Sequence, residues 1–281
     1  MRKVTLILAA FSILPIVSAQ EAQEAPKYGW QKEAVVSLNL TQASFDNYKQ
    51  GGENSRAWQV RSTVKFVNDR EKFLWANSGK FEYGNLKSGD KPVQKSVDEI
   101  KLESVLTYKV GKLLNPYLSA VGETQFAPGY DYSQSPKVKI SQFMDPGTFR
   151  EAMGLGYKPS DFFQIRLGAA AKQTLSRTFT SITDKPETEK IEKLKNEVGA
   201  ESVIDLNYKL GGTTQLKSKL ELFSNLKAFN KIDVIWDSDL TTKITKYIAF
   251  NFNVKLLYDR DVSAKRQLKQ VMGLGISYSL F

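Results

Sequence analysis

The sequence predicts an all-β fold: an antiparallel transmembrane β-barrel of about 12 strands, with short periplasmic turns and longer extracellular loops. Three observations predict it. The C-terminal segment alternates apolar and small residues and ends on phenylalanine, the N-terminus reads as a secretory leader, and apolar/polar alternation continues between them.

The C-terminal segment runs from Met272 to Phe281 and alternates apolar residues with small or polar ones. The last strand of a membrane barrel needs this pattern, because it faces lipid on one side and the lumen on the other. The assembly machinery of bacterial outer membranes reads a terminal aromatic residue. We therefore expect Phe281 to be the contact with the barrel-assembly machinery.

The N-terminal segment has a basic start at Arg2 and Lys3, an apolar run from Val4 to Val17 and a small-residue cleavage site that ends at Ala19. This predicts a signal peptide over residues 1–19, a periplasmic leader over 20–32 and the barrel over 33–281. A spanning helix needs about 20 apolar residues, so the run is too short to be an anchor. The expected location is the outer membrane of a Gram-negative bacterium, as an integral protein, after cleavage near Ala19.

The amino-acid composition limits the catalytic chemistry that the chain could perform. The chain has no cysteine, which excludes disulfides and thiol catalysis, and no histidine, the usual base near neutral pH. No catalytic residue, enzyme activity, cofactor or metal is therefore predicted. The formal net charge of +10 is spread along the strands, so nucleic acid is not an expected partner. Outer-membrane lipid and lipopolysaccharide are expected partners, and the oligomeric state is unknown.

Breaks between the alternating segments are short and long in turn, which is typical of an outer-membrane barrel with both termini in the periplasm. Five short turns and six long loops then connect 12 strands. The short breaks fall at 68–70, 111–115, 159–161, 211–212 and 245–246. The long breaks fall near 45–54, 87–97, 129–147, 179–197, 228–232 and 259–266.

The phase of the alternation assigns faces. In the segment 248–258, Phe250 and Phe252 share the apolar face, which we expect to meet lipid, and Asn251 and Asn253 share the polar face. Aromatic residues gather at both ends of the strands, as in the interfacial girdles of membrane barrels. The turn-side set is Phe66, Trp75, Tyr108, Tyr117, Tyr157, Phe163, Tyr208, Tyr247 and Tyr278; the loop-side set is Trp58, Tyr83, Phe126, Phe223, Trp236 and Tyr258.

The same phase predicts which charges face the lumen. The basic candidates are Arg61, Lys65, Lys101, Lys109, Arg166, Lys172, Lys209, Lys217, Lys219, Lys243, Lys255 and Lys269. The acidic candidates are Glu103, Asp205, Glu221, Asp237 and Asp239. Because bases outnumber acids in these sets, the sequence predicts a lumen that favours anions.

Three features of the sequence each allow two interpretations. Asp237 and Asp239, with Asp233 near the loop end, are either a carboxylate or cation site or counter-charges for Lys217, Lys219, Lys243 and Lys255; we favour the second. The run Gly51-Gly52-Glu53-Asn54 is either a ligand loop or a reverse turn. The segment 184–196 is either a short charged helix or, as we prefer, a solvated loop.

Several segments resemble a family of uncharacterised bacterial proteins, the domain-of-unknown-function family 3078. They are Asn39–Ser55, Leu216–Asn225, Ile232–Trp236 and Gly273–Tyr278. The resemblance implies an outer-membrane β-barrel and no established activity, so it carries no catalytic residue over. Members tend to end with the terminal aromatic in phase with the last tyrosine. Tyr278 and Phe281 are three apart and face opposite sides of a regular strand, which a bulge or a frayed end would reconcile.

Two functions follow from this pattern. The first is a passive channel for small anionic solutes, because the predicted lumen carries more bases than acids. The alternative is a non-conducting structural or partner-binding barrel whose lumen is filled by ion pairs. Twelve strands enclose more space than a packed eight-stranded barrel and less than a porin of 16 strands, so size alone does not choose between them.

Overall fold

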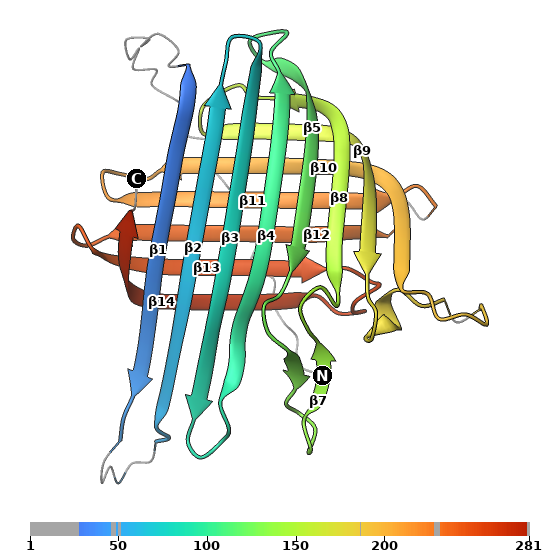
Figure 1. Ribbon diagram of the computed structural model, residues 1–281. Helices are drawn as coiled ribbons and strands as arrows, with labels where there is room; N and C mark the ends of the chain where they lie inside the picture. Colours follow the sequence, from blue (N-terminus) through green and yellow to red (C-terminus); the bar gives the residue numbers. More distant parts are fainter. Residues whose placement is uncertain (1–27, 46–48, 50–51, 186, 228–230, 280–281) are drawn as a thin grey trace, which may run out of the picture.

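The chain folds as one closed antiparallel barrel of twelve strands, as the sequence predicts (Figure 1). The computed structural model describes residues 28–45, 49, 52–185, 187–227 and 231–279. The predicted signal peptide, the cleavage site at Ala19 and Phe281 lie outside the described residues. Within the described part of the chain, no helix is long and apolar enough to cross a membrane.

Each barrel strand pairs with its neighbours in the chain, and β1 closes the barrel on β14 with Val36 opposite Tyr278. The hairpin β6–β7 stands apart, within the loop between β5 and β8. The strands are β1 (Gly29–Ala43), β2 (Ser55–Asp69), β3 (Phe73–Ser88), β4 (Gln94–Tyr108), β5 (Leu114–Thr124), β6 (Gly129–Asp131), β7 (Val138–Ser141), β8 (Gly147–Tyr157), β9 (Phe163–Leu175), β10 (Leu194–Lys209), β11 (Thr214–Asn225), β12 (Ile232–Lys243), β13 (Ile248–Tyr258) and β14 (Gln267–Ser279).

The order of turns and loops is the predicted one. Short connections follow β2, β4, β8, β10 and β12, and the longer ones, such as 125–146 and 176–193, leave from the opposite end. The segment 184–196 contains no α-helix in its described residues. A single 3₁₀ turn, η1 (Thr180–Ile182), precedes it, and β10 begins at Leu194.

The first strand begins earlier than predicted, so the leader does not extend to residue 32. β1 starts at Gly29 and pairs with β2 down to Asp69. The polar residues Gln31 to Glu33 hid this part of the strand, because they break the alternation near the membrane boundary. Trp30 shows why the strand extends: its ring lies 6.2 Å from the ring of Trp75 on β3, within the turn-side aromatic belt.

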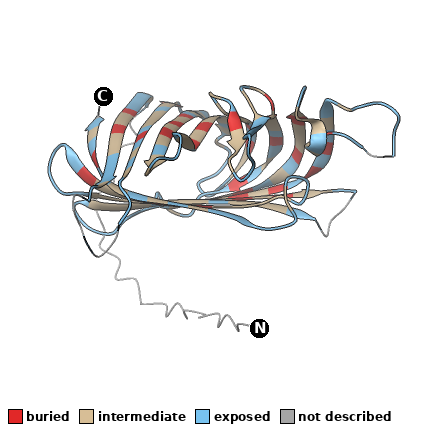
Figure 2. Cartoon of the chain, turned by 90° about the horizontal axis from the view of Figure 1, so that it is seen from below, coloured by how far each residue is buried: buried red, intermediate tan, exposed pale blue. Residues whose placement is uncertain are grey.

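The barrel is flattened, so two walls face each other closely (Figure 2). In Figure 1, strands β1 to β4 run along one wall, and β10 to β14 cross behind them on the other. Such crossing is expected, because barrel strands tilt by about 35–45° from the axis. Side chains that point inward from opposite walls therefore meet across the lumen.

The outer surface is apolar, as expected of a surface that meets lipid. Leu102 and Leu106 on β4 and Met272, Leu274 and Ile276 on β14 are all exposed. Lys101, next to Leu102, and Lys269, three residues before Met272, point inward. Glu151 on β8 departs from this pattern: it is exposed on the outer face, opposite Ala120 and Ala171 on the adjacent strands.

The aromatic girdles are present, with two corrections. Phe162 and Tyr208, and Tyr247 and Tyr278, form ring pairs at the turn side, and Trp58 pairs with Tyr83 at the loop side. Tyr117 and Phe223 do not belong to a girdle. In the alternation along its strand, each occupies a position that points into the barrel. Each is almost fully buried, in a cluster with Ala152 and Ala170. Their positions near strand ends suggested that they belong to the girdles. The alternation of side chains along the strand places them on the inner face instead.

Candidate functional site in the barrel lumen

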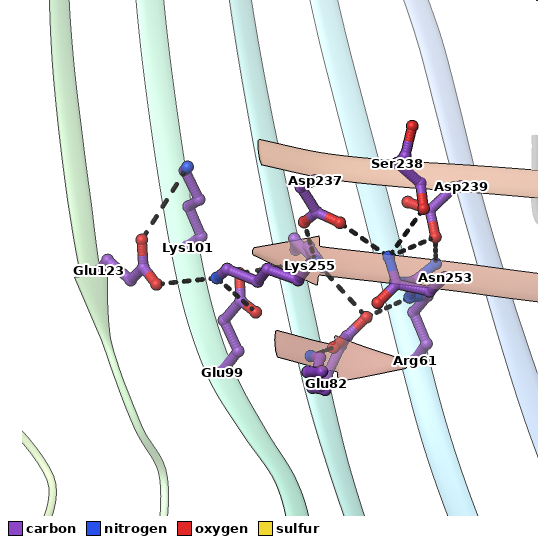
Figure 3. A network of polar contacts seen from close by, with 12 residues as sticks. Arg61, Glu82, Glu99, Lys101, Glu123, Asp237, Ser238, Asp239, Asn253 and Lys255 are labelled. Atoms are coloured by element: carbon purple, nitrogen blue, oxygen red, sulfur yellow. Dashed lines mark hydrogen bonds and ion pairs between the residues drawn. The ribbon is translucent and has the colours of Figure 1, made fainter. Parts of the chain in front are cut away.

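The lumen is crossed at mid-height by ion pairs between opposite walls (Figure 3). Lys80 on β3 places its Nζ 2.7 Å from Asp237 Oδ2 on β12. Arg61 on β2 donates to Asp239 Oδ1 at 2.5 Å. Asn253 on β13 donates to both aspartates, at 2.7 and 2.9 Å. Because β2 and β3 are not neighbours of β12 in the barrel, these contacts must pass through the lumen.

Glu82 on β3 is the most buried of these acids, with 1% of its surface exposed. Three bases surround it. Arg61 donates to it from β2, Lys269 on β14 lies 3.3 Å away, and Lys80 lies 3.6 Å away. A buried carboxylate is stable only when such partners replace its lost hydration.

Lys255 on β13 continues the network toward the loop side. Its Nζ lies 3.1 Å from Glu99 on β4 and 3.2 Å from Glu123 on β5, again across the lumen (Figure 3). Lys101, two residues after Glu99, lies 3.9 Å from Glu123 and also pairs with Glu221 on β11. Bases and acids thus alternate from wall to wall.

The other half of the barrel is filled in the same way. Arg150 on β8 pairs with Glu221 and lies 2.9 Å from Glu201 on β10, which also accepts the Tyr117 hydroxyl at 3.1 Å. Arg166 on β9 donates to Glu103 on β4 at 2.8 Å. Glu103 also pairs with Lys219 on β11, so one carboxylate holds two bases from two other strands.

We call this network the ionic belt. Among its described members, the carboxylates outnumber the bases. It comprises Arg61, Lys80, Glu82, Glu99, Lys101, Glu103, Glu123, Arg150, Arg166, Lys172, Glu197, Glu201, Asp205, Lys219, Glu221, Asp233, Asp237, Asp239, Lys255 and Lys269.

The structure places many of the predicted lumen residues in the belt. They are Arg61, Lys101, Arg166, Lys172, Lys219, Lys255 and Lys269 among the bases and Glu103, Asp205, Glu221, Asp237 and Asp239 among the acids. The remaining bases lie at the short-turn end. Lys109 bonds Asp69 and the Arg70 carbonyl, Lys217 lies 3.9 Å from Glu33, and Lys65, Lys209 and Lys243 are exposed there.

Sequence reasoning missed Lys80, Glu82, Glu99, Glu123, Arg150, Glu197 and Glu201. A signal was present for several of them. Glu99 lies an even number of residues from Lys101 and Glu103, and Glu197 and Glu201 lie an even number from Asp205, so all of them are expected on the inner face. In β3 the outward Gly79 and inward Gly84 weakened the alternation around Lys80 and Glu82. Because five of these seven residues are acids, the excess of positive charge predicted for the lumen is absent from the belt.

The aspartates of β12 act as counter-charges, but their partners are not the expected ones. Asp237 and Asp239 bond Lys80 and Arg61 on the opposite wall, and Asp233 bonds Lys172 on β9 at 2.7 Å. Among the described residues, no group of three or more histidines, cysteines, aspartates or glutamates could hold a metal ion.

A cavity of about 430 Å³ opens above the belt at the long-loop end. We call it the vestibule. Its walls include residues from the ends of strands and from loops, such as Thr124, Pro146 and Asp259, and its floor is formed by the belt residues Glu99, Glu123, Arg150, Glu221 and Lys255.

The loop that borders the vestibule is tied down by Asp145, which is 2% exposed. Its carboxylate accepts from the Ser176 hydroxyl at 2.7 Å and from the backbone N–H groups of Arg177 and Thr178 at 2.8 and 2.9 Å. Burial raises the pKa of Asp145, but these hydrogen bonds outweigh it and lower the pKa to about 2. The contact joins loop 125–146 to loop 176–193.

We expect this contact to be lost in acid. Because the pKa of Asp145 is lower in the folded state, its stabilisation is present above the ordinary pKa of about 4 and is lost as the pH falls toward 2. Hydrogen exchange at Arg177 and Thr178, corrected for its intrinsic pH dependence, should therefore accelerate between pH 5 and pH 2. The Asp145→Asn variant should exchange fast already at pH 5. Equal protection in both proteins at pH 5 would contradict this role.

The loop Gly51-Gly52-Glu53-Asn54 makes structural contacts through its described residues. Asn54 Oδ1 accepts from the Phe45 N–H at 2.6 Å, and its carbonyl accepts from Gly89 at 2.7 Å. Glu53 accepts from the Ser88 hydroxyl at 2.9 Å. The bond between Phe45 and Asn54 closes the first long loop, and the bonds from Ser88 and Gly89 join it to the end of β3 and the second long loop, which favours the interpretation as a turn.

Comparisons with known proteins support the family resemblance in part. The family described as "Protein of unknown function (DUF3078)" matches residues 40–130. This range contains most of the segment Asn39–Ser55 that carries the resemblance, and it ends before the three later segments. A search of curated proteins finds no match.

Solved structures that resemble this chain are outer-membrane barrels at low identity. The translocator domain of the autotransporter NalP from Neisseria meningitidis is 9% identical, with 90% of this chain and 89% of that chain covered and a TM-score of 0.41. The NanC porin is 8% identical (88% and 98% covered, TM-score 0.42). An outer-membrane channel from Pseudomonas putida F1 is 12% identical (91% and 96% covered, TM-score 0.39). Similarity at this level says nothing about what the lumen passes.

Proposed function

We propose that this chain is an integral outer-membrane barrel and that its lumen is a narrow passive channel in which the ionic belt is the constriction. One observation carries the proposal: the outer face is apolar, whereas the inner face is charged and is bridged from wall to wall. Ion pairs that join opposite walls, such as Lys80–Asp237 at 2.7 Å, occupy part of the cross-section of the lumen and so narrow it to a size suited to water and small solutes.

The belt argues against a strong preference for anions. Its carboxylates at least balance its bases, so the field at the constriction has no positive excess. A preference for small anionic solutes has support only at the short-turn mouth, where Lys65, Lys217 and Lys243 are exposed. We therefore expect weak discrimination between potassium and chloride.

A second candidate is a non-conducting structural or partner-binding barrel. The observation that favours it is the same belt, because pairs such as Arg61–Asp239 and Lys255–Glu99 join opposite walls and fill the flattened lumen. In this case the belt would serve to hold the two walls together, and function would lie in the loops or the vestibule.

Conductance in planar bilayers separates the two. The folded protein should show small, passive steps, and the double variant Lys80→Gln/Asp237→Asn should show larger ones, because it removes one cross-lumen ion pair without leaving an unpaired charge on either residue. The double variant Lys217→Gln/Glu33→Gln, at the exposed mouth, is the matched control and should leave the step size unchanged.

Two outcomes contradict the proposal, the first for the channel itself and the second for the role of the belt. If neither the unmodified protein nor the Lys80→Gln/Asp237→Asn variant conducts, the barrel is closed and the second candidate holds. If conduction is present with a reversal potential strongly on the chloride side in a potassium chloride gradient, the belt does not set the selectivity, and the lysines at the short-turn mouth do.

A further inference from the structure

The vestibule has apolar walls, which is unusual for the inside of a membrane barrel. Five inward positions on five strands carry apolar side chains there: Val97 on β4, Val121 on β5, Phe223 on β11, Ile235 on β12 and Leu257 on β13. On each strand, this residue lies an even number of positions from the charged residues that point inward, so its side chain points inward as well. The apolar wall is therefore a local feature of the lumen at this height.

The charged groups around these walls are mostly carboxylates. Lys172 lies between Asp233 and Asp259, at 2.7 and 2.8 Å, with Glu197 at 4.0 Å. At the floor, Lys255 is shared by Glu99 and Glu123. Glu99 and Glu123 also lie near Lys80 and Lys101, at 3.5 and 3.9 Å. The residues that line the cavity nevertheless include more acids than bases, so the cavity has a surplus of acceptors and of negative charge.

The two rim aspartates remain accessible from the cavity. The side chains of Asp233 and Asp259 are 17% and 23% exposed, whereas the Lys172 side chain that they hold is 11% exposed. The Lys172 ammonium also lies 5.7 Å from the centre of the Phe223 ring, a distance at which a cation is attracted to an aromatic face. The protein therefore already binds an alkylammonium group here, supplied by its own lysine.

We propose that the vestibule binds small organic cations that carry an ammonium group on an apolar body. The ammonium takes the place of, or joins, that of Lys172 between Asp233 and Asp259, and the body packs against Ile235, Leu257 and Val97. A volume of about 430 Å³ fits a small molecule. An organic anion of the same shape meets the surplus of carboxylates and is excluded. This inference goes beyond the proposed channel, because binding from the loop side does not require conduction.

The test compares three probes of one size: hexylammonium, hexanoate and 1-hexanol. Binding to the folded full chain is measured by calorimetry in a zwitterionic detergent, with the signal of empty micelles subtracted. Hexylammonium should bind at least tenfold more tightly than hexanoate, and 1-hexanol should fall between them. Binding of hexanoate as tight as hexylammonium, or no binding of any probe, overturns the proposal.

Substitutions should change the affinity for hexylammonium in opposite directions. Lys172→Met should tighten hexylammonium binding about tenfold, because it removes the competing ammonium and leaves Asp233 and Asp259 free. Asp233→Asn should weaken it about tenfold. Ile235→Ser should weaken hexylammonium but leave methylammonium unchanged. Glu33→Gln, at the far mouth, is the control and should change nothing.

Heat-modifiable gel mobility shows whether each variant has folded. Lys172→Met and Asp233→Asn change opposite partners of one ion pair, and Ile235→Ser changes the apolar wall, so failure of one variant to fold leaves the others. Unchanged affinity in folded Lys172→Met and Asp233→Asn variants overturns the proposal. These results are independent of conductance: a barrel that carries no current but binds hexylammonium refutes the channel and keeps the site.

Discussion

The Glu82→Gln variant should lose about 3–5 kcal/mol of unfolding free energy, the cost of leaving buried charges without their partner. Glu82 is 1% exposed and is the shared counter-charge of Arg61, Lys80 and Lys269. A glutamine of the same shape keeps the packing but leaves three bases facing one another with less compensation. The measurement is equilibrium unfolding by urea of the barrel folded into phospholipid vesicles.

Glu33→Gln is the control for this loss. The side chain of Glu33 is 52% exposed at the short-turn mouth and lies 3.9 Å from Lys217, an exposed pair whose removal costs less than about 1 kcal/mol. If the two variants lose the same free energy, water fills the lumen freely and the belt does not hold the walls together.

Phe252→Lys should cost roughly 2–4 kcal/mol, because Phe252 lies on the lipid face near the middle of β13, where a lysine loses its hydration. Asn251→Lys should cost much less, since Asn251 points into the lumen and bonds Thr241 and Asn39 there. Asn253, the other inward neighbour, is a poorer control because it is buried against Asp237 and Asp239.

Unfolding in vesicles and the fraction that inserts into them both measure this difference. Similar losses for Phe252→Lys and Asn251→Lys would mean that the two faces of β13 do not differ in polarity, and the orientation of the barrel wall would then be wrong.

The sequence predicted the barrel wall because the wall depends on local rules. Parity assigns Phe252 and Asn253 to opposite faces, and breaks such as 211–212 place the turns, whatever the rest of the chain does. The start of β1 was missed because the polar residues Gln31 to Glu33 break the alternation there. Tyr117 and Phe223 were assigned to the wrong face because their position near a strand end was given more weight than the alternation along the strand.

The pairing of charges inside the lumen could not be predicted. Lys219 lies opposite Asp237 in the register of β11 and β12, yet it pairs with Glu103 on β4. The strands that face each other across the lumen depend on the tilt of the strands and on the flattening of the barrel. The local alternation of residues predicts neither of these. The vestibule was missed for a related reason: Ile235 and Leu257 pair across β12 and β13, but Val121 is far from both in the chain and comes to the same cavity only in the closed barrel.

The contact between Lys269 and Glu82 has a consequence for how the barrel closes. Lys269 is on β14, the last strand, and Glu82 is on β3, so this pair exists only after β14 has docked on β1. A slip of one residue at that seam would turn Lys269 toward lipid and leave Glu82 without one of its bases. The C-terminal strand β14 therefore completes the charge balance of β3, and Glu82 keeps all of its bases only when the seam between β14 and β1 is in the correct register.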